Sequence, residues 1–293
     1  MTFRNIARLA IVTVVLVLGV WAFAWEPASL VTRTHRVAIP QWRVELAGLR
    51  VIVLGDLHVG SPYQGLSKLA EIVDRANAAN ADLILLPGDF VVDDVIGGRF
   101  VSPEDSAAVL ARLRAPLGVW AVLGNHDRWL SAKRVQIALE QHGIRVLEDR
   151  AVRLNRGDSP FWLVGISDFK EGPHDVRSAM RDVESESPVL MFTHNPDVFP
   201  TIEKAFSLLI AAHTHGGQVY LPLIGRPIVP SRYGQRYAIG HIRERGKHLF
   251  VTSGIGTSMI PVRFRVPPEV TVLELYPVDG MDSAARDETR AAQ

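Results

Sequence analysis

Aspartate, asparagine and histidine gather in five short motifs, and each motif directly follows a short apolar run. The motifs are Gly55-Asp56-Leu57-His58, Pro87-Gly88-Asp89, Gly124-Asn125-His126-Asp127, Thr193-His194-Asn195 and His213-Thr214-His215-Gly216-Gly217. Carboxylate and amide oxygens and neutral imidazole nitrogens are donor atoms with which proteins hold divalent metal ions. The chain has ten His, and five of them fall inside these motifs. The joint pattern favours metal coordination over ordinary core or surface histidines.

The spacing inside the motifs fits one shared site. Asp56 and His58 lie two residues apart, as do His213 and His215. In an extended chain, residues i and i+2 point to the same side, so each pair can face one metal cluster. The glycines of the motifs allow tight turns and close approach of the backbone. An aspartate can bridge two cations because its carboxylate has two oxygens.

The apolar runs before the motifs have the length of short buried strands. These expected strands are Val51–Leu54, Leu83–Leu86, Val119–Leu123, Val189–Phe192 and Leu208–Ala212. In α/β folds, ligands gather beyond the carboxyl ends of the strands. Motifs that are far apart in the sequence can therefore meet in one cleft.

Helical segments alternate with the strands of the first half. Helices are expected over 66–79, from Ser102 onward and over about 131–142. The second half is richer in strands, which are expected at Ile144–Leu147, Ala151–Leu154, Phe161–Ile166, His248–Thr252 and Val270–Leu275. The pattern predicts an α/β fold of two stacked mixed β-sheets flanked by helices, an α/β/β/α sandwich, with an N-terminal transmembrane helix.

The N-terminus carries the expected transmembrane helix. Leu9 to Trp25 is an uncharged, mostly apolar run of 17 residues that follows Arg4 and Arg8. Seventeen residues is the low end for a helix that spans a bilayer. Trp21 and Trp25 stand where an aromatic belt would meet the membrane surface. We expect a single-pass anchor in a bacterial-type inner membrane.

A cleaved signal peptide is the alternative for this segment. Ala22 and Ala24 form an A-x-A pattern, but the neighbouring Trp residues make a poor cleavage site. The side of the membrane stays open, because Arg33 and Arg36 soon follow on the other side of the run.

The chain divides into four expected parts. They are an anchor over 1–27, a linker and lead-in over 28–48, one catalytic domain over 49–277, and a polar disordered tail over 278–293. Lys plus Arg is 32 and Asp plus Glu is 31, for a net charge of +1, so no nucleic-acid partner is expected. The absence of Cys excludes thiolate metal sites.

Taken in order, the motifs resemble those of the calcineurin-like metallophosphoesterases over roughly residues 49–275. Ala212 departs from the pattern, because the family often has Gly before its His-x-His. The anchor, Thr193-His194-Asn195-Pro196-Asp197 and His215-Gly216-Gly217-Gln218 resemble a membrane-associated bacterial branch. That branch includes phosphodiesterases that cleave UDP-2,3-diacylglucosamine in lipid A synthesis.

The resemblance implies a role for each motif residue. The first metal would be held by Asp56, His58 and His215, and the second by Asn125, His194 and His213, with Asp89 bridging both. His126 would not bind metal but would lie near the phosphate and stabilise or protonate the leaving oxygen, and Asp127 would orient His126. The two divalent cations would be Mn, Fe or Zn, among which the sequence does not choose.

Two later stretches are expected to shape the substrate site. Tyr220–Tyr237 and Gly256–Pro268 mix apolar residues with arginines, which suits an amphipathic, lipid-linked phosphate at a membrane surface. Arg263 is the expected phosphate contact. A phosphomonoesterase remains an alternative, as does a catalytically inert membrane-tethered scaffold, although every expected metal ligand is present.

Overall fold

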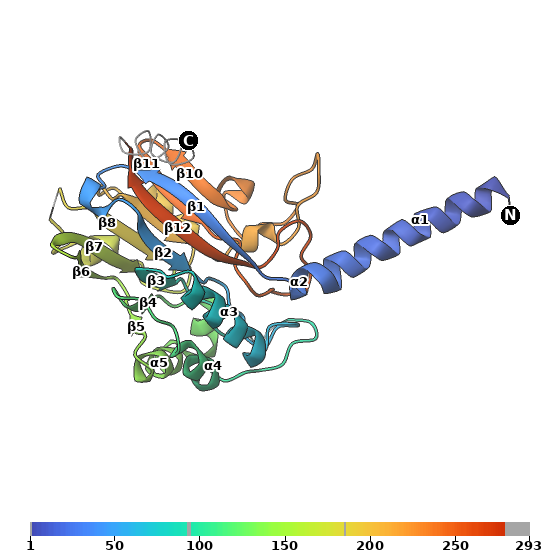
Figure 1. The fold of residues 1–293 in the computed structure, drawn as a ribbon, viewed down its shortest axis with the longest axis horizontal. Helices are drawn as coiled ribbons and strands as arrows, with labels where there is room; N and C mark the ends of the chain where they lie inside the picture. The colour runs from blue at the N-terminus through green and yellow to red at the C-terminus, as the bar shows by residue number, and fades with distance from the viewer. Residues whose placement is uncertain (1, 93–94, 185, 279–293) are drawn as a thin grey trace, which may run out of the picture.

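The computed structural model describes residues 2–92, 95–184 and 186–278, and it stacks two six-stranded sheets (Figure 1). The first sheet has the order β1 (Val31–Ile39), β12 (Glu269–Pro277), β2 (Leu49–Val53), β3 (Leu83–Leu86), β4 (Val119–Ala121) and β5 (Arg145–Val146). The second has the order β10 (Gly240–Glu244), β11 (Lys247–Val251), β9 (Leu208–Ala211), β8 (Val189–Thr193), β7 (Ser159–Ile166) and β6 (Arg150–Arg156). Both sheets are mixed, because β12 pairs antiparallel with β2, and β6 and β10 pair antiparallel with their neighbours.

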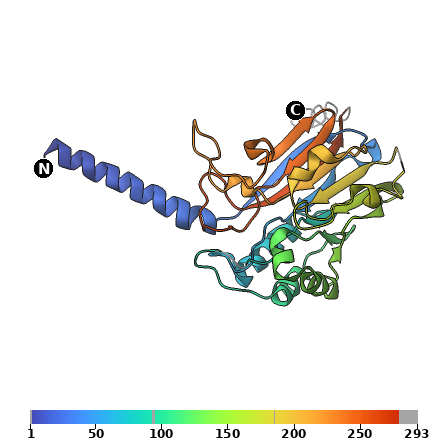
Figure 2. The same cartoon turned by 180° about the vertical axis from the view of Figure 1, so that it is seen from behind.

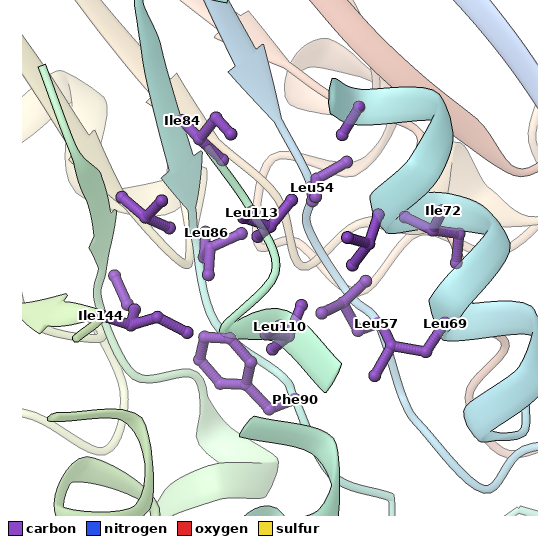
Figure 3. Packing of buried hydrophobic residues seen from close by; sticks show 14 of the residues in the cluster. Leu54, Leu57, Leu69, Ile72, Ile84, Leu86, Phe90, Leu110, Leu113 and Ile144 are labelled. Carbon is purple, nitrogen blue, oxygen red and sulfur yellow. The ribbon is translucent and has the colours of Figure 1, made fainter. Parts of the chain in front are cut away.

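Helices cover the outer face of the first sheet. They are α3 (Leu66–Ala78), α4 (Pro103–Leu110) and α5 (Asn125–Gln141). Figure 3 shows Leu69 and Ile72 of α3 pointing toward Leu54 and Leu57, which follow β2. A second apolar cluster fills the space between the two sheets. A third covers the outer face of the second sheet, below α6 (Val176–Ala179) and the 3₁₀ turn Pro196–Thr201, so the predicted four-layer sandwich is confirmed.

Two edge strands were not expected from the sequence. β1 pairs parallel with β12 inside the segment predicted as a linker, and β10 forms the edge of the second sheet. An edge strand has a neighbour on one side, so it can carry polar and charged residues and shows little apolar pattern. In β1, Arg33 and His35 turn their polar ends to Glu269 of β12.

The helix predicted over 131–142 begins earlier, at Asn125. Its first turn holds the Asn125, His126 and Asp127 motif, and the helix is interrupted at Ser131, where the backbone is extended. The motif therefore lies at the N-terminal end of a helix, directly after β4. Ser102 caps α4 as predicted, because its side chain accepts a hydrogen bond from the Asp105 N–H.

The N-terminal helix extends away from the domain (Figure 2). It consists of α1 (Phe3–Val20), a π-helical turn at Trp21–Trp25 and α2 (Glu26–Ala28). By length and composition its 26 residues can cross a membrane, and almost none of the apolar stretch is buried by the protein. The predicted tail over 278–293 lies outside the described residues from 279 onward.

Candidate metal centre

The five polar motifs lie just beyond the carboxyl ends of β2, β3, β4, β8 and β9. The two sheets thus contribute ligands to one cluster. Within the described residues its His and Asp donor atoms form three overlapping groups, in each of which they lie within 4.8 Å of one another: Asp56, His58 and His215; His58, Asp89 and His126; Asp89, His194 and His213. All of these side chains are buried.

One half of the cluster centres on His58. Its Nε2 lies 3.1 Å from Nε2 of His215 and 3.5 Å from Oδ2 of Asp89. The two imidazole rings stack, with centroids 4.9 Å apart. Asp56 completes this half and accepts the His213 N–H on Oδ1 at 2.9 Å, while its buried Oδ2 has no hydrogen-bond partner among the described residues.

The other half centres on His194. Its Nε2 lies 3.0 Å from Oδ1 of Asn125, 3.0 Å from Nδ1 of His213 and 3.3 Å from Oδ2 of Asp89. Oδ2 of Asp89 is therefore close to both His58 and His194. This is the position that a carboxylate bridging two cations would occupy.

Backbone carbonyls fix the tautomers of two of these histidines. Nδ1 of His58 lies 3.2 Å from the Val91 carbonyl oxygen, and Nδ1 of His194 lies 2.8 Å from that of Pro87. A carbonyl only accepts, so each Nδ1 carries the proton. The Nε2 atoms then point into the cluster, where the neutral His58 ring offers a lone pair and His194 would offer one once a cation replaces its Nε2 proton.

The electrostatics of the cluster favour a cation. Burial lowers the pKa of His58 to about 4, and it also holds the pKa values of His213 and His215 well below the usual range. These rings are therefore neutral ligands at pH 7. Burial also lowers the pKa of His194, but the Asp89 and Asp56 charges outweigh it and raise that pKa to about 10. The carboxylates thus draw positive charge into the cluster.

Five of the predicted ligands have a strained backbone conformation. Asp56, His58 and Asp89 have φ values of 50°, 39° and 58°, and His213 and His215 have 70° and 50°. Non-glycine residues rarely adopt this left-handed region, and each such residue costs roughly 1–3 kcal/mol. Such strain persists where the surrounding structure imposes a functional geometry.

Two glycines are required because the strand-end loops pass close together. A Cβ on Gly124 would lie 2.1 Å from Oδ1 of Asp89, and one on Gly88 would lie 2.4 Å from the Gly124 nitrogen. Any larger residue at either position would displace the loop that carries Asp89. The glycines therefore let the Asp89 carboxylate pack against the start of α5.

Asp127 does not do what we expected from the sequence. Its carboxylate accepts four backbone N–H groups, from Gly124, Asp89, Phe90 and Val91. These hydrogen bonds clamp the loop after β3 to the start of α5. Asp127 therefore positions the Asp89 segment, and its oxygens are already used by the backbone instead of the His126 ring.

His126 lies beside the cluster. Its ring is 4.8 Å from that of His58 and 4.6 Å from that of Trp129, whose side chain is exposed. Its backbone N–H donates to Oδ1 of Asp89 at 3.0 Å. The imidazole therefore borders both the metal ligands and the surface.

Arg263, the expected phosphate contact, is fully buried. Its guanidinium donates to the carbonyl oxygens of Ser253, Gly256 and Val266 through all three of its nitrogens. These bonds occupy the donors that a phosphate would need. We therefore revise its role: Arg263 organises the loop beside Asp56 and places a positive charge near that carboxylate.

Sequence reasoning missed one buried carboxylate at the site. Asp168 follows β7, and its charge helps to raise the pKa of His194. One of its oxygens accepts the N–H groups of Lys170 and Glu171, and the other is buried with no hydrogen-bond partner in the part of the chain that the structure describes. Its position after an apolar strand, shared with the five motifs, was the signal that could have identified it.

Together, the donors suit divalent cations. Among the described residues, ring nitrogens of five histidines and oxygens of Asp56 and Asp89 form groups whose atoms lie within 4.8 Å of one another, and the Asn125 amide oxygen lies 3.0 Å from His194. Buried donor atoms without a partner, such as Oδ2 of Asp56 and Nε2 of His213, remain available. Nitrogen and oxygen ligands of this kind accept Mn, Fe or Zn.

Comparisons with known proteins also match this chain to phosphoesterases. A sequence profile described as calcineurin-like phosphoesterase matches residues 49–217. Phosphodiesterase YaeI of Escherichia coli (strain K12) is 32% identical, over 85% of this chain and 90% of that protein. The UDP-2,3-diacylglucosamine pyrophosphatase LpxG of Chlamydia trachomatis is 24% identical, over 87% of this chain and 92% of that protein. A transmembrane protein with metallophosphoesterase domain from Danio rerio is 28% identical, over 94% of this chain and 63% of that protein.

Proposed function

This chain belongs to the calcineurin-like phosphoesterase family, and from that membership we propose that it cleaves a phosphodiester in a membrane-associated or nucleotide-linked lipid. It is a metal-dependent hydrolase of phosphoric esters. Its His and Asp cluster can hold the two divalent metal ions that this family binds. The proposed substrate is similar to UDP-2,3-diacylglucosamine, and the proposed location is a bacterial inner membrane.

The proposed ligand assignment follows the two halves of the cluster. One ion would be held by Asp56, His58 and His215, and the other by Asn125, His194 and His213, with Asp89 shared between them. Bound there, the two cations would supply charge that polarises the phosphoryl oxygens and acidifies water. The protein's contribution is a buried, preorganised set of neutral and anionic donors.

His126 is the proposed proton donor for the leaving oxygen. Its ring borders His58 and the exposed Trp129, so it can reach an ester that enters from the surface. A positioned imidazole that protonates a leaving group typically contributes about 10²–10⁴-fold to the rate. In this account His126 touches the substrate, whereas Asp127 acts through the backbone around Asp89.

The observation that carries the lipid substrate is the contact between the anchor and the site. The Arg263 N–H donates to the Ala22 carbonyl oxygen at 2.9 Å, and the Val266 N–H donates to the Glu26 carboxylate. In the same loop, the Gly256 N–H donates to the Asp56 carbonyl oxygen at 2.7 Å. One loop therefore joins the base of the apolar helix to a metal ligand, which supports a substrate that lies at the membrane surface.

The test compares esters on the purified, metal-loaded full chain in detergent. The probes are bis(p-nitrophenyl) phosphate, p-nitrophenyl phosphate and UDP-2,3-diacylglucosamine, each assayed beside Asp89→Asn. We expect turnover of the diester to exceed that of the monoester, and the nucleotide-linked lipid to be the best substrate.

The other outcomes separate the alternatives. Preference for the monoester would contradict the phosphodiesterase and favour a phosphomonoesterase. Turnover of the small diester without any turnover of the lipid would contradict the lipid substrate alone. Bound metal without turnover of any ester would revive the inert scaffold.

A further inference from the structure

Large apolar side chains are exposed on three loops near the metal centre. Leu223, Ile228 and Met259 expose 106%, 79% and 71% of their surface. We call the whole set the apolar rim; it consists of Ile96, Phe100, Leu223, Ile224, Ile228, Met259 and Ile260. Single exposed apolar residues are ordinary on a soluble protein, whereas a cluster of this kind marks an interaction surface.

Hydrogen bonds join the three loops. The Ile96 N–H donates to the Met259 carbonyl oxygen at 3.0 Å, which links the loop after β3 to the loop after β11. The Gln218 side chain bonds to the backbone of Ser258 and Ile260, and thereby links the loop after β9 to the same place. The apolar rim is therefore carried by one connected structure.

The rim is continuous with the base of the N-terminal helix. The loop that carries Met259 and Ile260 also bonds to Ala22 through Arg263, and the Phe264 ring packs 5.5 Å from that of Trp21. In Figures 1 and 2 the helix leaves the domain on the side from which the teal loop after β3 and the gold-orange loop before β10 project. A bilayer crossed by α1 would meet this side of the domain.

The charge of two of the three loops, those after β9 and β11, suits an anionic lipid surface, whereas the loop after β3 contains Asp93 and Asp94 as well as Arg99. Residues 219–230 and 256–268 contain no Asp or Glu. The guanidinium groups of Arg226 and Arg265 lie over the Tyr220 ring, at 5.2 and 5.7 Å from its centre. Arginine and tyrosine beside exposed aliphatic side chains are the combination found at the headgroup level of membranes.

We propose that the apolar rim inserts into the same bilayer that α1 crosses, and that Arg226 and Arg265 bind its anionic headgroups. The domain would then rest on the membrane with its metal centre near the lipid surface, instead of swinging freely from its anchor. This docking concerns the surface of the protein and does not depend on which ester the metal centre cleaves.

The absence of native cysteine makes the test direct, because a single cysteine can be introduced and labelled with a fluorophore. The positions are Leu223→Cys, Ile228→Cys and Met259→Cys, with Val44→Cys as the matched control. Val44 is 70% exposed but precedes β2, so it lies at the end of the strand opposite to Asp56. The full-length variants are reconstituted into phosphatidylcholine vesicles with or without phosphatidylglycerol, and nitroxide-labelled lipids serve as quenchers.

We expect lipid quenching at the three rim positions to be at least about threefold stronger than at Val44, and to increase with phosphatidylglycerol. Equal quenching at the rim and at Val44 would overturn the proposal. Weak quenching together with disulfide-linked pairs of the Ile228→Cys chain in dilute vesicles would also overturn the proposal. That result would show that the apolar rim contacts a second copy of the chain instead of lipid. Thermal unfolding checks that each variant is folded, so the result is independent of enzyme turnover.

Discussion

The metal centre and the apolar rim invert the usual distribution of side chains in opposite ways. At the metal centre, Asp56, His58 and His194 are charged or polar and fully buried. At the rim, Leu223 and Ile228 are apolar and exposed. Each inversion costs free energy in water, and each is relieved by a partner outside the chain: divalent cations for the first and, in our proposal, lipid for the second. In this account the metal centre carries out the reaction, and the apolar rim determines where the domain lies on the membrane, although one connected set of loops carries both.

Removing the metal ions should have the largest effect and should affect only one of the two regions. We expect EDTA to reduce ester turnover to background and to lower the unfolding temperature, because ions that bind the folded state stabilise it by about 2.7 kcal/mol at one hundred times their Kd. Lipid quenching at Leu223→Cys should stay unchanged. As a control, adding Mn²⁺ should restore turnover. If EDTA abolished lipid quenching as well as turnover, the metal centre and the apolar rim would not be independent of each other.

His126→Ala should separate chemistry from metal binding. We expect turnover to fall by about 10²–10⁴-fold while the metal content stays as in the unchanged chain, because our assignment places His126 beside the proposed ligands and not among them. The loss should be greatest for esters with poor leaving groups. Full activity on such an ester would show that another group donates the proton.

Glu26 connects the two regions, and its replacement should have an intermediate effect. This carboxylate is buried, accepts the Val266 N–H and the Trp21 indole N–H, and faces the charge of Arg263. We expect Glu26→Ala to reduce the free energy of unfolding by about 1–3 kcal/mol, since buried donors lose their acceptor. Removal of residues 2–18 leaves this contact intact and is the control. A shortened chain that lacks residues 1–27 should lose as much free energy of unfolding as Glu26→Ala. Wild-type stability of both variants would show that Glu26 does not connect the two regions.

The smallest expected effect concerns a second pair of histidines, His241 and His248. Nε2 of His241 lies 3.1 Å from Nδ1 of His248, as close as the pair at the metal centre, but neither belongs to a group of possible metal ligands among the described residues. Burial, His248 and Arg243 lower the pKa of His241 to about 4. The unfolded chain then binds more protons between about pH 6.5 and 4, so stability falls as the pH falls through this window.

We expect His241→Gln to reduce this acid sensitivity by roughly 1 kcal/mol, a value discounted for solvent screening of a half-buried group. Urea unfolding of both chains at pH 7 and pH 5 measures this difference in acid sensitivity. The metal content of His241→Gln should equal that of the unchanged chain. An unaltered pH dependence would show that the pair does not determine acid stability.

The metal centre was largely predictable from the sequence, for a physical reason. The proposed ligands Asp89 and His194 follow buried parallel strands, and such strands have a strong apolar pattern. The edge strands β1 and β10 lack that pattern and were missed. The roles of individual side chains were less predictable, because a role depends on the direction in which the side chain points, and the sequence shows only the spacing between residues.

Asp127 and Arg263 illustrate the difference. Both were expected to act on another ring or on phosphate, and both instead bond to backbone groups. The sequence contains the residue types, but a loop's path decides which groups their donors and acceptors meet. The rim was likewise anticipated only as apolar residues mixed with arginines, since burial or exposure of Leu223 depends on how three separate loops are joined.

The most direct test of the central claim is the metal stoichiometry of the purified chain and of Asp89→Asn, measured by mass spectrometry beside phosphodiester turnover. Asp158→Asn, the same change at an exposed position in the turn between β6 and β7, is the matched control. Our account predicts two divalent ions per chain with turnover in the unchanged protein and in Asp158→Asn, and loss of both metal and turnover in Asp89→Asn. Two ions and full turnover in Asp89→Asn would contradict it.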